Sequence, residues 1–265
     1  MNGSASRGSG SEGYVLWLLA GPVLAFLVVP VIIVLIVSFS GADYLQFPPP
    51  SLSLKWHWRF WADPGWRQAA IVSLELAAMA ALIATPFGAA AAIALTRGRL
   101  PGRGFLYAML LAPMIIPTII TAIGYYFVAA RLHLLGSVFG IAVGEAVLAL
   151  PIVVIVMTAN LHGFDRRLEQ AALSLGASPW YAFRRVTLPL VAPGVLSASL
   201  FAFLSAFDEL LIPLFAGGIR VQSLTTRIWS GLQVELDTTI AAVSALFIGA
   251  TTAVLAISAL LVRRR

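Results

Sequence analysis

The chain has 265 residues, of which 60% are hydrophobic and only 11% charged, with a mean hydropathy of +0.95 and a formal net charge of +6. Soluble domains of this length do not have such a composition, so we expect an integral membrane protein. The absence of cysteine excludes disulfides and thiolate metal sites. The glycine-rich pattern of a P-loop does not surround Lys55, so any dependence on ATP must come from a partner.

Apolar runs predict the secondary structure, because a helix needs about 20 mainly apolar residues to cross the roughly 30 Å hydrocarbon core. Six runs are long enough, near residues 14–40, 68–96, 105–130, 138–161, 190–215 and 239–262. Residues 1–13 are rich in serine and glycine and predict a disordered tail, and residues 263–265 form a basic end. We therefore expect an all-α polytopic membrane protein whose six transmembrane helices lie within residues 14–262.

Basic residues beside the spans predict the orientation, since Lys and Arg are held preferentially on the cytoplasmic side. With the N-terminus inside, eleven basic residues lie in inner segments: Arg7, Arg97, Arg99, Arg103, Arg166, Arg167, Arg184, Arg185, Arg263, Arg264 and Arg265. Six lie in outer segments: Lys55, Arg59, Arg67, Arg131, Arg220 and Arg227. Both termini are thus expected in the cytoplasm. Anionic lipid of the inner leaflet explains the net positive charge without nucleic acid.

The outer segment between the first two spans, residues 41–67, contains the tryptophan-rich stretch KWHWRFWADPGW. Tryptophan is enriched where the membrane meets water, so we interpret this stretch as a segment on the membrane surface. Contact with a partner protein is the alternative.

Prolines recur inside the predicted spans: Pro22, Pro30, Pro86, Pro113, Pro117, Pro151 and Pro213. Each removes a backbone donor, and the freed carbonyl must be satisfied within the protein or by water. As a set they favour kinked helices around a pathway over a passive anchor. For any single proline, a kink that serves packing alone is the alternative.

Four acidic residues lie inside the predicted spans: Glu75, Glu145, Asp208 and Glu209. A charge at the centre of a span costs about 2.5 to 3.5 kcal/mol on insertion scales, which usually marks function. At about 1.5 Å per residue, all four lie in the outer half of their spans and predict an acidic vestibule open to the exterior. The alternative is that these carboxylates are purely structural groups at helix ends. This alternative is weakest for the adjacent pair in the fifth span, Asp208 and Glu209.

Patterns typical of enzymes are missing from the sequence. The three histidines, His57, His133 and His162, fall in or beside different loops and form no i, i+4 pair for a metal ion. A G-x-S-x-G nucleophile motif is also absent. We therefore expect neither a catalytic site nor a bound cofactor or metal.

The inner segment at residues 162–189 is polar and long for a connector. Asp165 can cap a short helix, and Gly176 is suited to the left-handed residue that ends it. Ser178 and Pro179 read as the N-cap and first position of a second helix. The sequence thus predicts a helix, a glycine turn and a helix on the cytoplasmic face. Periodicity alone leaves open whether this segment lies on lipid or contacts another protein.

The same segment resembles the EAA signature of permease subunits of ABC importers, E-A-A-x3-G-x9-I-x-L-P. The matching positions are Gln170, Ala171, Ala172, Gly176, Val186, Leu188 and Pro189. Gln170 replaces the glutamate of the signature and Glu169 directly precedes it, so an ionic role of that position is in doubt. The similarity extends through the LPIVV, LHGFD and SAFDELLIPLFAGG stretches, and is greatest to the smaller permease of spermidine/putrescine-type importers.

The resemblance implies a MetI-like helical bundle in the bacterial inner membrane, which pairs with a second, homologous permease. It further implies two cytoplasmic ABC ATPase subunits docked on the EAA loops, and an extracytoplasmic binding protein that delivers the solute. Asp208 and Glu209 stand where polyamine members carry an acidic pair. The segment VELDTTIAAVSAL departs from those members, so another small solute, such as an aminophosphonate, is the alternative. A cation-coupled secondary carrier, which needs no ATPase, is the rival from a different class.

Overall fold

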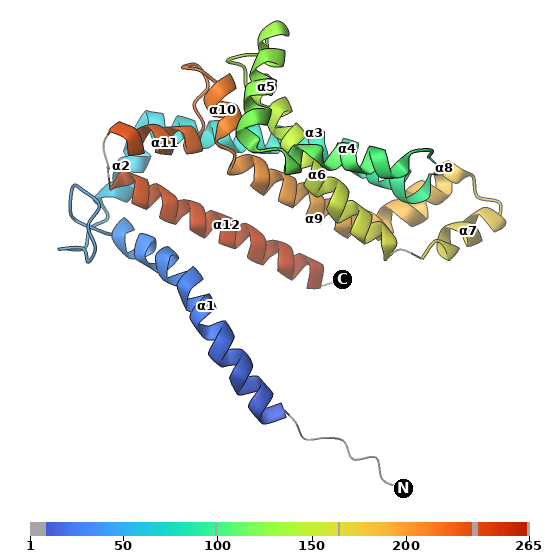
Figure 1. Cartoon of the computed structure of the whole chain (residues 1–265), viewed down its shortest axis with the longest axis horizontal. Helices are drawn as coiled ribbons and strands as arrows, with labels where there is room; N and C mark the ends of the chain where they lie inside the picture. The colour runs from blue at the N-terminus through green and yellow to red at the C-terminus, as the bar shows by residue number, and fades with distance from the viewer. Residues whose placement is uncertain (1–8, 99, 164, 235–237, 264–265) are drawn as a thin grey trace. The chain divides into compact units, whose positions relative to one another are not determined.

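The computed structural model describes residues 9–98, 100–163, 165–234 and 238–263, which are mostly helical (Figure 1). An isolated bridge of strand type pairs Ser40 with Leu52. The contacts divide the chain into two units, Met1–Asp63 with Gly231–Thr252 and Pro64–Ser230 with Ala253–Arg265. The helices are α1 (Ser9–Ser38), α2 (Lys55–Ala62), α3 (Pro64–Arg97), α4 (Arg103–Ile115), α5 (Thr118–Arg131), α6 (Val138–His162), α7 (Arg167–Ser174), α8 (Pro179–Ala182), η1 (Phe183–Thr187), α9 (Leu188–Phe207), α10 (Leu211–Ala216), α11 (Leu224–Val234) and α12 (Thr239–Arg263).

In the first unit, polar bonds organise the loop that follows α1. The carbonyl of Ala42 accepts hydrogen bonds from Nε1 of Trp56, at 3.0 Å, and from Oγ1 of Thr238, at 3.2 Å. Trp56 is buried, whereas Trp58, two positions along α2, is 71% exposed. Alternate burial of large aromatic residues agrees with an interfacial segment, because such rings pack on one side and meet lipid headgroups on the other.

In the second unit, α3, α6 and α9 run alongside one another (Figure 1). Alanine dominates the buried cluster that they share: Ala77, Ala80, Ala84, Ala92, Ala146, Ala149, Ala198, Ala202 and Ala206, together with Val153, Met157 and Val191. Lipid tails are as apolar as leucine, so membrane helices associate through close packing, which small residues permit. Gly88 shows how close this packing is, since a Cβ placed there would lie 2.7 Å from Cβ of Val153.

Of the six spans that the apolar runs predict, the described residues support four or five. By length and apolarity, four helices of the described residues can cross a membrane: Trp17–Ser38, Pro64–Arg97, Val138–His162 and Pro179–Phe207. A fifth is reached if α4 and α5 form one bent span. Along the sixth predicted run, residues 239–262, α12 forms one continuous helix, Thr239–Arg263.

The third predicted span, residues 105–130, is not one straight helix. α4 and α5 meet at 101°, with Ile116 in an extended conformation. Pro117 explains the break, because it lacks a backbone N–H and disfavours helical geometry in the residue before it. Counting apolar residues detects such a run but not its bend.

The predicted tail and basic end also lie partly outside the described residues. Residues 1–8 and 264–265 are not described, whereas α1 begins at Ser9 and Arg263 ends α12.

Candidate functional site

The cytoplasmic segment predicted at residues 162–189 forms a helix, a turn and a second helix. α7 ends in a turn at Gly176, whose φ of 89° favours a residue without Cβ. The N–H of Ala177 donates to the carbonyl of Ala172 at 3.1 Å, and the N–H of Gly176 to that of Leu173 at 3.0 Å. These two bonds are the pair that defines a Schellman motif, so they satisfy carbonyls that the end of α7 leaves free.

Both helix starts in this segment use the predicted side chains. Oδ1 of Asp165 accepts from the backbone N–H of Arg167, the first residue of α7, at 2.9 Å. Oγ of Ser178 accepts from the N–H of Tyr181 at 3.3 Å, and Pro179 begins α8. Asp165 stands one position before the N-cap, Arg166, so its role differs slightly from the predicted cap.

The second helix contains a feature that the sequence did not predict, the π-helical turn η1. The N–H of Leu188 bonds the carbonyl of Phe183, five residues earlier. Pro189 follows directly and cannot donate to this ladder, and in an α-helix its ring would press on the carbonyl four residues before it. The wider turn relieves this conflict, so α8, η1 and α9 form one continuous helix, Pro179–Phe207.

Glu169 faces inward from α7. Its Oε2 accepts from Nη1 of Arg97 at 2.8 Å and from Oγ1 of Thr187 at 2.9 Å. In a second hydrogen bond between this segment and α3, Nη2 of Arg166 donates to the carbonyl of Thr96 at 2.7 Å. The segment at residues 162–189 is therefore held against the end of α3 and the start of α9.

The outer side of the segment exposes apolar and small side chains. Gln170 and Ala171 are exposed and Ala172 is half-buried. Leu175 is 89% exposed and Trp180 68% exposed, and none of the described side chains of α7 is fully buried. Large exposed apolar residues that cluster usually mark a surface that meets a partner or a membrane.

The four intramembrane acids do not share one environment. Glu145 of α6 is 1% exposed, with Oε2 lacking a hydrogen-bond partner among the described residues, and it lies within electrostatic reach of Glu209. Glu209 is half-buried, whereas Glu75 and Asp208 are exposed. No described interaction links Glu75 to the other three acids. The structure thus brings Glu145, Asp208 and Glu209 together more closely than Glu75.

Asp208 and Glu209 lie at a break in the fifth predicted span, residues 190–215, where α9 ends and α10 begins. Pro213 explains the break, because its ring would clash with the carbonyl of Glu209, four residues earlier, and cannot bond it. Oγ1 of Thr225 donates to that carbonyl instead, at 2.9 Å. Broken helices at membrane depth are tolerated only where other groups satisfy the backbone in this way.

The carboxylate of Glu209 also bonds the backbone. Its Oε1 accepts from the N–H groups of Leu211 at 2.8 Å and Ile212 at 3.4 Å. Glu209 therefore has a structural role at the start of α10, whatever its role toward a solute. Asp208 is the more exposed carboxylate at the break.

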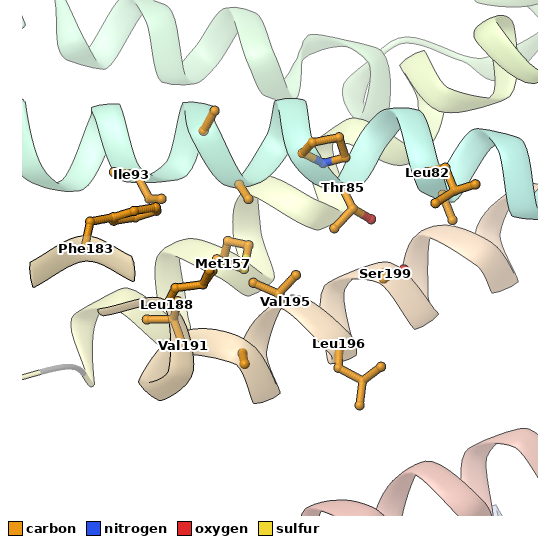
Figure 2. Close-up of a pocket in the computed structure, with 15 residues that line it drawn as sticks. Leu82, Thr85, Ile93, Met157, Phe183, Leu188, Val191, Val195, Leu196 and Ser199 are labelled. Carbon is orange, nitrogen blue, oxygen red and sulfur yellow. The ribbon is translucent and has the colours of Figure 1, made fainter. Parts of the chain in front are cut away.

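A cavity of about 690 Å³ lies among α3, α6, η1 and α9 (Figure 2). Figure 2 shows Leu82, Thr85 and Ile93 on one side and Leu188, Val191, Val195, Leu196 and Ser199 on the other. All of its described lining residues are uncharged, and most are apolar. Such a lining fits an acyl chain or a neighbouring helix, not the binding site of a charged solute.

Comparison with known proteins then decides the family. The family model described as "Binding-protein-dependent transport system inner membrane component" matches residues 84–265. The chain belongs to this family. Its members are inner-membrane permeases of ABC importers, so the expected class of protein and the MetI-like fold are confirmed.

Relatives of this permease cover most of its length. The spermidine/putrescine transport system permease protein PotC of Haemophilus influenzae is 30% identical over 91% of this chain and 94% of its own. The putrescine transport system permease protein PotI of Escherichia coli is 29% identical over 85% of this chain and 82% of its own. A crystal structure of a bacterial ABC transporter involved in the import of the acidic polysaccharide alginate shares the fold, with a TM-score of 0.69 at 16% identity over 99% of both chains.

The part of the permease that matches the family model contains the segment at residues 162–189 and the acids at positions 145, 208 and 209, but not Glu75. Two residues that bond Glu169, Arg97 and Thr187, were not predicted from sequence. Thr187 lies within the spacer of the EAA signature, and Arg97 precedes Glu169 by 72 residues. Sequence patterns reveal neighbours three or four residues apart on a helix, not contacts at such a separation.

Proposed function

We propose that this chain is the permease subunit of an importer for polyamine-like cations such as putrescine and spermidine. The observation that carries the proposal is 30% identity to a spermidine/putrescine permease over nearly the whole of both chains. The acidic break at Asp208 and Glu209 supports it, because carboxylates exposed in a membrane protein attract cations. The shared fold alone does not decide the solute, since a transporter of an acidic polysaccharide has it too.

The proposed assembly contains a second homologous permease, two cytoplasmic ABC ATPase subunits and an extracytoplasmic solute-binding protein. ATP hydrolysis is assigned to the partners, because the chain itself has no P-loop. Dependence on a binding protein is the family's own description. Membrane lipid surrounds the permease domain, residues 14–262.

The ATPase-coupling loop is assigned to residues 162–189. Its proposed contact surface is the outer side of α7 and the turn that follows, together with the start of α9. The residues of this surface are Gln170, Ala171, Ala172, Gly176, Leu188 and Pro189, and Glu169 is the inward-facing member of the coupling loop. Exposed Leu175 and Trp180 support this assignment, because they give the loop an apolar surface of the kind that protein partners cover. The carboxylate of Glu169 faces inward and bonds Arg97 and Thr187.

The candidate translocation pathway is the region of Asp208 and Glu209, with Glu145 behind them and Glu75 as the least supported member. In the proposed pathway the broken α9–α10 segment provides backbone and carboxylate groups for an ammonium ion. Non-helical backbone at membrane depth commonly lines a cavity or a pathway, which supports this placement.

Reconstitution tests the proposed function. The permease, assembled with its ATPases, second permease and binding protein in proteoliposomes, should accumulate labelled putrescine only when ATP is supplied on the ATPase side. Uptake without ATP would instead indicate a secondary carrier. Uptake of an aminophosphonate, with no uptake of putrescine or spermidine, would overturn the proposal that the solute is a polyamine-like cation.

Cysteine labelling tests the proposed topology, in which both termini and the coupling loop are cytoplasmic. The natural chain has no cysteine, so a single introduced cysteine is the only thiol that the reagent can label. Ser51 and Ser178 are both exposed in the structure, which makes them comparable sites. In intact cells, an impermeant reagent should label Ser51→Cys and spare Ser178→Cys until the membrane is opened. Labelling of both from outside would contradict this orientation.

A further inference from the structure

The coupling loop contacts the membrane helices through one carboxylate. Oε2 of Glu169 accepts from Arg97 and Thr187 at 2.8 and 2.9 Å, and we name these three residues the Glu169 clasp. The three residues lie on α7, at the end of α3 and in η1. A single oxygen therefore joins α7 and η1 to the end of α3, which is distant from both in sequence.

Burial makes this contact more than a surface ion pair. The side chains of Arg97 and Glu169 are only 18% and 26% exposed, and Thr187 is fully buried. Charge-assisted hydrogen bonds are roughly twice as strong as neutral ones, and partial burial limits their screening by salt. The clasp should therefore hold α7 in place more firmly than an exposed ion pair, which contributes little to stability.

The clasp also connects α7 with the cavity in the membrane helices. Phe183 begins η1 and lines that cavity together with Ile93 of α3, whereas Thr187 ends η1 and bonds Glu169 (Figure 2). α3 packs along both α6 and α9. The clasp thus links α7 both to the end of α3 and, through η1, to the start of α9.

We propose that Glu169 is a positioning residue that transmits motion of the coupling loop to α3 and α9 through the clasp. Gln170, at the position of the signature's glutamate, is exposed and uncharged, so the outward contact and the inward transmission belong to neighbouring residues. This inference rests on the proposed role of the loop in docking the ATPase. The Glu169 clasp explains how motion of the docked ATPase reaches α3 and α9.

The experiment compares Glu169→Gln, Arg97→Gln and the double variant in the reconstituted transporter. Three quantities are measured: co-purification of the ATPase, ATP hydrolysis, and putrescine taken up per ATP hydrolysed. Each single variant should retain the ATPase but lose about fivefold or more of the uptake per ATP, the lower end of usual coupling between sites. The double variant should be no worse than either single one, because each single variant already removes the ion pair between positions 97 and 169.

Two further variants separate transmission from folding. Thr187→Ser keeps the hydroxyl and should keep the uptake per ATP, whereas Thr187→Val removes it and should lower the ratio. Arg103→Gln removes an exposed arginine at the start of α4 and should behave as the natural protein. A merely structural role would lower the yield of complex without changing the ratio.

The inference is overturned if uptake per ATP is unchanged in Glu169→Gln, or if the effects of the two single variants add. It is also overturned if Glu169→Gln releases the ATPase, since Glu169 would then belong to the docking surface. The docking role itself is tested at Ala172, so a failure there is distinguishable from a failure of the clasp.

Discussion

Replacing Ala172 with tryptophan should abolish co-purification of the ATPase subunits and substrate-stimulated ATP hydrolysis. Ala172 is half-buried on α7, and the segment after it turns sharply through the bond from Ala177. An indole at this position blocks the close approach that a small side chain permits. Ala172→Ser is the matched control, because it remains small and should retain the ATPase.

Gly176→Val should have the same effect through the backbone. A Cβ at Gly176 meets nothing within 4 Å, so the substitution acts through its φ of 89° and not through a clash. The left-handed conformation costs about 1 to 2 kcal/mol for ordinary residues. Asparagine adopts this conformation more readily, so Gly176→Asn should retain more of the coupled ATP hydrolysis than Gly176→Val.

The alternative for this loop, an amphipathic segment lying on lipid, gives the opposite result. A larger apolar residue at position 172 should then strengthen interfacial binding and leave the ATPase attached. Pull-down of the ATPase with Ala172→Trp at the yield of the natural protein, with hydrolysis still stimulated by substrate, would show that the loop is not the coupling surface.

Local signals predicted the turn of the coupling loop, because the residues that determine it are adjacent in sequence. Gly176, Ser178 and Pro179 have the conformations and bonds that their types indicate. The partner of Glu169 could not be predicted in this way. Arg97 reaches it only after α3 and α6 have packed, and that packing depends on the shapes of many alanines rather than on a motif.

Hydropathy likewise detected every apolar run but not the geometry inside it. Pro117 and Pro213 each lie in a predicted span, yet one lies at a 101° bend and the other follows a break at two carboxylates. The prolines of α1 and Pro151 of α6 instead remain inside continuous helices. Whether a proline breaks a helix depends on which groups can satisfy the freed carbonyl, and Thr225 does so for Glu209 only in the folded chain.

Removing both charges at this break, by Asp208→Asn with Glu209→Gln, should sharply reduce putrescine uptake at low concentration. A hydrogen bond to a charged group contributes about 1.5 to 3 kcal/mol, which corresponds to roughly a 10- to 100-fold loss of apparent affinity. Glutamine keeps an acceptor oxygen for the N–H groups of Leu211 and Ile212, so the start of α10 should be preserved. The measurement is uptake as a function of putrescine concentration, together with the yield of assembled transporter.

The two single variants show which carboxylate meets the solute. Asp208 is exposed, whereas Glu209 is half-buried and already bonds the backbone, so Asp208→Asn should account for most of the loss. High putrescine concentration should restore the rate, because affinity and not assembly is reduced. Poor insertion cannot explain such a result, since removing a charge from membrane depth eases insertion. Unchanged uptake at low concentration in the double variant would leave Asp208 and Glu209 with only a structural role in the break between α9 and α10.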